Sequence, residues 1–205
     1  MDNVEDIYGA IFEAARLDPS KPLRRGAIEL VERILGRCAV YESADPSREL
    51  VVDGRAGSRR FIGIRRGTLP VRANFVVAKG LTQILLERWG IEPTEELVRR
   101  VAASLVVPPV PFREAIAAGV PLPYIARFNS TSQSVIVLRV GEVLEGRSSA
   151  LLTEEGKVYG RGPGLVAHLP SEDLVRLAAK PIVKCVERRR LTDERGRIAF
   201  FQRPT

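Results

Sequence analysis

The sequence predicts an α+β protein dominated by helices, with a small mixed sheet in its first 65 or so residues and a C-terminal extension of strands and helices. Three observations predict this class. Apolar residues recur at helical spacing before residue 36 and again from about residue 75 to residue 145. Short apolar runs separated by turn residues lie between residues 39 and 65. From about residue 148 the pattern changes to short strand-like runs, so we expect one domain over residues 1–147 and an extension or small domain over residues 148–205.

The N-terminal third predicts two helices and three strands. Apolar residues at helical spacing cover residues 4–15, and Asp18-Pro19 ends that helix. A second apolar stripe over residues 27–35 is closed by Gly36. The strand-like runs lie at residues 39–42, 49–52 and 60–65. We expect these strands to form the small mixed sheet.

The next segment predicts the central helix of the protein. Asn74 has the side chain of an N-cap, and the helix expected over residues 75–88 is apolar around most of its circumference. Gly90 ends it, and Thr94 caps a second helix that runs to about residue 107. Because a helix with so wide an apolar surface needs cover on several sides, we expect it to be buried beneath the sheet and flanked by the second helix.

The remaining elements include a pair of helices with the proportions of a helix-turn-helix. These are the helices expected over residues 122–128 and 132–144. A helix that reads DNA presents polar side chains to the major groove, but residues 135–138 are all apolar. We therefore expect the second helix to pack in the core. The other expected elements are helices at 112–118 and 171–179, a hairpin over 151–159, and strands at 181–188 and 197–203.

The charge of the chain is positive and concentrated in two blocks. The net charge is +7 and the isoelectric point about 9.9. No acidic residue occurs from Gly54 to Leu86, and the tail from residue 180 is also rich in basic residues. Such blocks are compatible with nucleic acid or with an acidic partner protein. The candidate phosphate contacts in the first block are Arg59, Arg60, Arg65, Arg66 and Arg72.

Several classes of protein are excluded or disfavoured by composition. His168 is the only histidine, so the chain cannot build a zinc site from two histidines. The cysteines Cys38 and Cys185 lie far apart and indicate reduced thiols. No apolar run approaches the roughly 20 residues that span a bilayer, and the acidic N-terminus is unlike a secretory signal. We therefore expect a cytoplasmic protein that has no cofactor and no contact with a membrane.

Three blocks of the chain resemble the ImmA/IrrE metallopeptidase family. Residues 74–86, with the sequence NFVVAKGLTQILL, resemble its active-site helix, which reads FTLAHELGH followed by an apolar triplet. Residues 95–108, with the sequence EELVRRVAASLVVP, resemble its E-x-x-A-x-x-F-A-A-x-L-L-M-P segment. Residues 125–140 resemble a later helix pair, and the blocks occur in the family's order over roughly residues 21–145. The resemblance implies a zincin-like core.

The departure from the family motif bears on function. In the family, two histidines one helical turn apart bind zinc, and the glutamate beside the first acts as general base. Lys79, Gly80 and Gln83 stand at these places, and only Glu95 remains where the family has its third, acidic ligand. The resemblance therefore implies a pseudo-peptidase without metal. We expect an ion pair between Lys79 and Glu95 to replace the metal as the link between the two helices. The plainer interpretation of residues 75–86 is a core helix with a lysine at its solvent-exposed end.

Three classes of function follow. The first, implied by the resemblance, is a non-catalytic regulatory protein that binds a partner protein through the former peptidase cleft in bacterial or phage gene regulation, because active members of the family cleave repressors. The second is a basic nucleic-acid-binding protein that uses residues 55–72 and the C-terminal tail, whose binding would weaken steeply with salt. The third is an enzyme with replaced chemistry, for instance with Lys79 as base.

Overall fold

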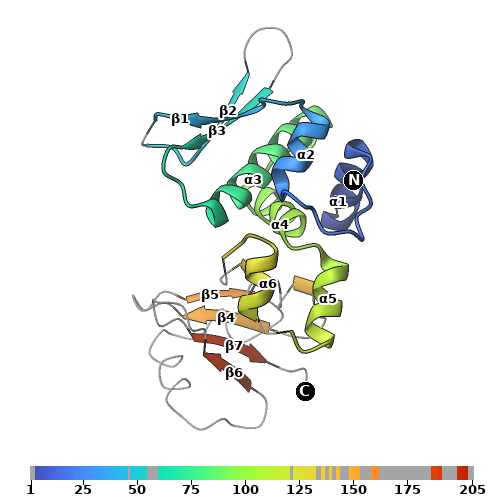
Figure 1. Ribbon diagram of the computed structural model, residues 1–205, viewed down its shortest axis with the longest axis vertical. Coiled ribbons are helices and arrows are strands. Elements are labelled where there is room, and N and C mark those ends of the chain that lie inside the picture. Colours follow the sequence, from blue (N-terminus) through green and yellow to red (C-terminus); the bar gives the residue numbers. More distant parts are fainter. Residues whose placement is uncertain are drawn as a thin grey trace. The chain divides into compact units, whose positions relative to one another are not determined.

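The computed structural model describes residues 3–45, 47–54, 60–120 and 122–132, five positions between 135 and 143, and four strands between 148 and 202 (Figure 1). The chain divides into two compact units. The first comprises Met1–Glu114 and Arg127–Thr131, and the second Ala115–Ala126 and Ser132–Thr205. The second unit therefore takes in residues that the sequence analysis assigns to the first domain, and the boundary at residue 147 stays a prediction.

The first unit opens with the two expected helices, α1 (Val4–Ala15) and α2 (Ala27–Ile34). The N-cap of α1 is Asn3, whose side chain accepts a hydrogen bond of 2.9 Å from the backbone N–H of Glu5. The helix ends at Arg16, which takes up the left-handed conformation with φ 54°. The apolar residues that recur at helical spacing along α1 form its buried face. They are Ile7, Tyr8, Ile11, Phe12 and Ala15.

The three expected strands form one mixed sheet. They are β1 (Val40–Ser43), β2 (Leu50–Gly54) and β3 (Arg60–Arg65), in the order β1-β3-β2. β3 runs parallel to β1 and antiparallel to β2. Ile62, in the middle of the central strand, lies opposite Val40 on one side and Val52 on the other, and its side chain is fully buried.

The central helix is longer than predicted. α3 spans Pro70–Arg88, with Leu69 as its N-cap and proline at its first position. Proline suits this place because its fixed φ is helical and its missing N–H would have no partner inside the helix. The expectation that Asn74 caps the helix is therefore wrong: Asn74 lies within α3, and its side-chain amide is used to bind other segments.

The helices that follow agree with the prediction in type and order. They are α4 (Glu95–Val106), α5 (Pro109–Ala117) and α6 (Leu122–Phe128). Thr94 is the N-cap of α4, as expected, and its hydroxyl accepts a hydrogen bond of 3.3 Å from the backbone N–H of Leu97. α5 begins earlier than expected, at Pro109, so the second proline of the Pro108-Pro109 pair starts the new helix.

The second unit contains a four-stranded antiparallel sheet in the order β5-β4-β7-β6. Its strands are β4 (Ser148–Leu152), β5 (Val158–Arg161), β6 (Val186–Arg190) and β7 (Ile198–Gln202). The expected hairpin is confirmed, since Leu151 lies opposite Tyr159. In the segment expected as a helix over 132–144, the described positions 135, 136, 139, 142 and 143 are helical. Ile136 and Val143 are buried, as a core helix requires. The helix expected over 171–179 lies outside the described residues.

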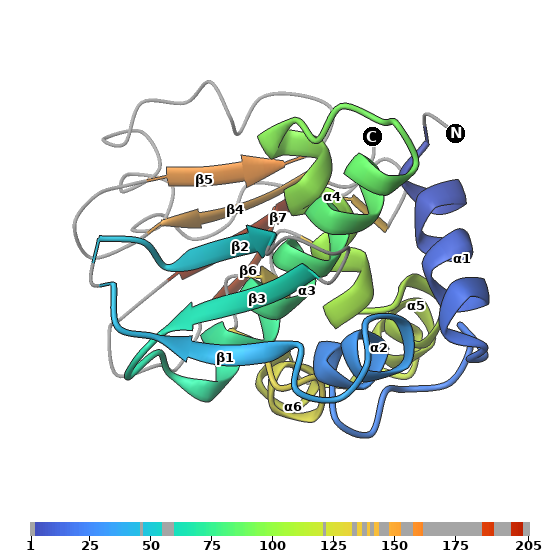
Figure 2. The same cartoon turned by 90° about the horizontal axis from the view of Figure 1, so that it is seen from above.

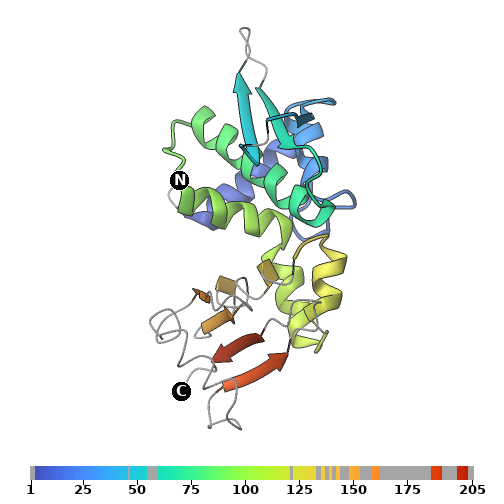
Figure 3. The same ribbon diagram turned by 90° about the vertical axis from the view of Figure 1, so that its left-hand side faces the viewer.

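α3 forms the core of the first unit. It contacts β2 and β3 on one side and α4 on the other, so it lies between the sheet and α4 (Figures 2 and 3). α2 also packs on α3, while α1 packs on α2 and α4. The α+β class with dominant helices and a small mixed sheet is thus confirmed, as is the buried central helix. The fully buried large side chains of α3 are Leu81, Ile84, Leu85 and Leu86.

A matched pair of leucines tests this core. Leu85 is 1% exposed and Leu69, just before α3, is 67% exposed. We expect Leu85→Ala to lower the free energy of unfolding by about 2–5 kcal/mol, because truncation leaves a cavity in the core. Leu69→Ala should change it by no more than about 0.5 kcal/mol. Urea denaturation of both variants measures the difference, and equal losses would contradict the assigned core.

Candidate functional site

At Gly80, α3 lies close against the sheet. Gly80 is buried, and a Cβ atom added there would lie 2.8 Å from Ile62 Cγ2 and 3.1 Å from Leu50 Cδ1. Packed side chains do not approach one another so closely, so any larger residue would push α3 away from β2 and β3. Glycine in a helix interior is about 0.5–1 kcal/mol less favourable than alanine. The close contact between α3 and the sheet explains why glycine occupies this position despite its lower helix propensity.

The expected link between Lys79 and Glu95 is absent. In the part of the chain that the structure describes, no ion pair joins these residues. Lys79 is half-buried, whereas Glu95 is exposed in the first turn of α4, where a carboxylate interacts favourably with the helix dipole. The charge of Lys79 instead acts toward the sheet, since it is one of the cations that lower the pKa of Glu49. The ion-pair prediction was wrong because it assumed that Glu95 is desolvated beside α3, whereas its carboxylate is exposed to solvent.

The side chains at the positions that resemble the zinc motif of the ImmA/IrrE family do not suit a metal. Lys79 is cationic, Gly80 has no side chain, and the Gln83 amide donates a hydrogen bond of 3.1 Å to Glu87 Oε1. Over the described residues, no group of three or more histidine, cysteine, aspartate or glutamate side chains is placed to hold a metal ion. Cys38 is an exposed free thiol; Cys185 and His168 lie outside the described residues. Nor is any helix in the described segments long and apolar enough to cross a membrane.

The arginines predicted to contact phosphate are largely engaged with carboxylates. The pairs are Arg60 with Glu87 at 2.9 Å, Arg66 with Glu42 at 3.6 Å, and Arg72 with Glu49. Arg65 is exposed at the end of β3, and Arg59 lies outside the described residues. A phosphate group would have to compete with these carboxylates for Arg60, Arg66 and Arg72.

Arg72 and Glu49 form the best-defined of these ion pairs. Arg72 binds Glu49 through both Nε and Nη2, and the Nη2–Oε2 distance is 2.8 Å. Two parallel hydrogen bonds of this kind fix orientation as well as charge. The hydrogen bond from Arg72 is the main reason that the pKa of Glu49 lies below its ordinary value, and the charges of Arg65 and Lys79 add to the effect. The same bond raises the pKa of Arg72.

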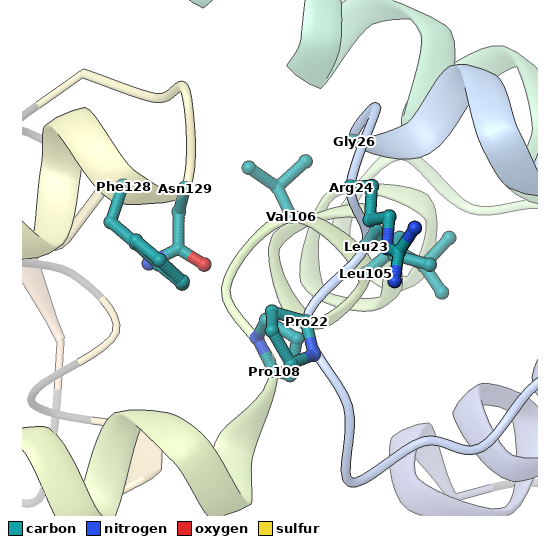
Figure 4. Close-up of a pocket in the computed structure, with 9 residues that line it drawn as sticks. All are labelled: Pro22, Leu23, Arg24, Gly26, Leu105, Val106, Pro108, Phe128 and Asn129. Carbon is teal, nitrogen blue, oxygen red and sulfur yellow. The ribbon is translucent and has the colours of Figure 1, made fainter.

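The first unit also contains a cavity that the sequence did not predict. It has a volume of about 290 Å³ and is lined by residues from three segments (Figure 4). These are Pro22, Leu23, Arg24 and Gly26 before α2, Leu105, Val106 and Pro108 at the end of α4, and Phe128 and Asn129 at the end of α6. Leu105, Val106 and Pro108 form a buried apolar wall. Phe128, which lines the cavity from α6, is 71% exposed.

Asn74 holds two of the three walls together. Its Oδ1 accepts a hydrogen bond of 2.7 Å from the backbone N–H of Ala27, and its Nδ2 donates to the carbonyl oxygens of Asn129 at 3.1 Å and Ser130 at 3.3 Å. Gly26, beside Ala27, has φ +61°, and a Cβ atom there would collide with the Asn74 amide. Pro70 is the residue in the sequence that could have predicted this role. Proline favours the first position of a helix, and a helix that begins at Pro70 contains Asn74, whose side chain is then available to bind other segments.

Comparison with known proteins gives a likeness of fold. No protein-family model matches this sequence, and no curated protein matches it. Among solved structures, a Mycobacterium tuberculosis transcriptional regulator superposes with a TM-score of 0.61 at 11% sequence identity, covering 98% of this chain and 88% of that chain. At this level of identity the likeness extends to the fold alone.

Two helical glycines test the close approach at Gly80. Gly9 lies in α1, and a Cβ atom there would meet nothing within 4 Å. We expect Gly9→Ala to stabilise the protein by about 0.5–1 kcal/mol, because alanine is the better helix former. Gly80→Ala should instead destabilise it by about 1–3 kcal/mol through overpacking against Ile62. Thermal and urea denaturation measure both, and stabilisation by Gly80→Ala would show that the helix and the sheet are not in close contact.

The Arg72–Glu49 pair predicts a pH-dependent contribution to stability. Because the pKa of Glu49 is lowered in the folded state, the pair stabilises the fold above the unfolded pKa and loses its effect as pH falls through the folded pKa. Arg72 and Glu49 are 66% and 31% exposed, so the effect is screened by solvent. We expect Arg72→Gln to cost at most about 1 kcal/mol at neutral pH, and its effect to vanish below the folded pKa of Glu49. Glu49→Gln should remove the same term in a double-mutant cycle, whereas a constant difference at all pH values would contradict the assignment.

Proposed function

We propose that this protein is a pseudo-peptidase with a zincin-like core, which takes part in gene regulation by binding a partner protein through the surface that active relatives use for substrate. The observation that carries this proposal is Gly80, buried under Ile62 at the place where the resembling family has its general base. A glutamate there would need space that the sheet occupies. The proposed loss of peptidase chemistry is thus supported by packing as well as by the residue types.

The arrangement around α3 supports the zincin-like part of the proposal. The helix that carries Lys79 and Gln83 lies under a small mixed sheet, with β2 as an antiparallel edge strand. α4, which begins with Glu95, packs on the other side of α3. The likeness of fold to a transcriptional regulator supports a regulatory role for the proposed protein.

Lys79 is the side chain best suited to contact the partner. It is half-buried, and within the described segments its ammonium has no carboxylate at ion-pair distance. Lys79 interacts with Glu49 only as one of several charges that lower the pKa of that carboxyl group, so a partner that brings a carboxylate to this position would add a direct ion pair. This places an acidic or repressor-like regulator ahead of nucleic acid, because three of the candidate phosphate contacts already have carboxylate partners.

The experiment combines metal analysis with partner capture. We expect the purified full chain to contain no stoichiometric zinc and to keep its melting temperature in the presence of a chelator, because Lys79, Gly80 and Gln83 offer no zinc ligands and the described residues contain no other ligand set. Tagged protein should retain a regulatory protein from nuclease-treated lysate, identified by mass spectrometry. Lys79→Ala should reduce retention about tenfold, the effect of one desolvated charged contact.

Lys21→Ala is the matched control, since Lys21 is an exposed lysine that pairs with Asp18 at 3.8 Å. This variant should retain the partner as the wild type does. Stoichiometric zinc would refute the pseudo-peptidase assignment. Equal retention by the two lysine variants would refute the assigned surface, and capture that requires nucleic acid would favour a DNA-binding or RNA-binding protein instead.

A further inference from the structure

Most of the side chains that line the cavity of the first unit are apolar. Pro22 and Pro108 form one side, Phe128 faces the cavity from the opposite side, and Val106 closes it between them (Figure 4). Three of these four side chains are rigid rings. Flat, rigid walls favour a planar ligand, because a ring can contact them without losing the conformational freedom that a flexible chain would lose.

Arg24 adds a positive charge to this apolar lining. Its neighbour Arg25 is already neutralised, with Nη1 at 2.6 Å from Glu32 Oε2. The carboxylate of Glu29 accepts hydrogen bonds from the backbone N–H groups of Arg24 and Arg25. For the Arg24 guanidinium, the described residues supply no ion-pair partner. The cavity therefore offers an unpaired planar cation beside an apolar space.

The size of the cavity limits the ligand. A cavity of about 150 Å³ holds benzene, and this one has about 290 Å³. It therefore has room for one aromatic ring with a short side arm, roughly ten to twelve non-hydrogen atoms by the same proportion. Guanidinium groups bind carboxylates through two parallel hydrogen bonds, so the chemistry of Arg24 selects a carboxylate as the end of that arm.

We propose that this cavity binds a small aromatic carboxylate, with its ring between Phe128 and the two prolines and its carboxylate at Arg24. The site is separate from the proposed partner surface around Lys79, and direct binding measurements on this protein test it whether or not a partner is found. Asn74 is a positioning residue for the site, because its hydrogen bonds hold the segments of Ala27 and Asn129 in place.

The test uses 3-phenylpropanoate as the probe for the full chain, with calorimetry for affinity and NMR for location. We expect a Kd of about 1 mM or tighter, and shifts of the backbone amides of Gly26 and Asn129. The neutral alcohol of the same skeleton, 3-phenylpropan-1-ol, should bind about tenfold more weakly because it lacks the charge. Octanoate keeps the charge but replaces the ring by a flexible chain, and it should also bind more weakly.

Two pairs of variants decide the assignment. Arg24→Gln should weaken binding of 3-phenylpropanoate about tenfold, whereas Arg25→Gln should leave it unchanged. Phe128→Ala should also weaken binding, whereas Leu69→Ala, which removes an exposed apolar side chain outside the cavity, should not. Absence of saturation at about 10 mM would overturn the site. Equal effects of Arg24→Gln and Arg25→Gln would overturn the role of Arg24, and octanoate binding as tightly as the probe would overturn the aromatic class.

Discussion

The contact between α3 and the sheet at Gly80 is the constraint on which the first unit depends. Because no Cβ atom intervenes, Ile62 and Leu50 reach the backbone of the helix. This lets a three-stranded sheet with one short parallel strand cover the middle of a 19-residue helix. The neighbouring residue, Lys79, is half-buried, and its charge contributes to the lowered pKa of Glu49. One glycine therefore determines both the packing of the core and the chemistry that remains possible beside it.

A second set of contacts determines the shape of the cavity. Asn74 accepts one hydrogen bond from the start of α2 and donates two to the turn after α6, so one amide satisfies backbone groups of two separate segments. Backbone groups at such places need partners when they are removed from water. The cavity lies among those same segments and the end of α4. Hydrogen bonds from Asn74 thus fix the backbone segments around the cavity, while apolar side chains and Arg24 line most of its interior.

Local signals in the sequence predicted most elements, because each depends on short-range physics. The spacing of Ile7 and Ile11 marked α1, and the Thr94 cap marked α4. The predictions that failed concern contacts between residues far apart in the sequence. Asn74 has the chemistry of a helix cap, and only the fold shows that its partners lie 47 and 55 residues away. The predicted Lys79–Glu95 pair failed for a similar reason. Helical spacing predicts which residues share a face of one helix, but it does not predict whether Glu95 on the next helix is buried or exposed.

Gly26 and Asn74 limit each other's evolution. A side chain at position 26 would collide with the amide at position 74, and the positive φ of Gly26 disfavours most residues in any case. A smaller residue at position 74 would make room, but it would leave backbone groups at Ala27, Asn129 and Ser130 without their partner. A substitution at either position alone is therefore expected to lower the stability of the fold. The two residues form an epistatic pair, because replacing both by successive mutations passes through a less stable single variant.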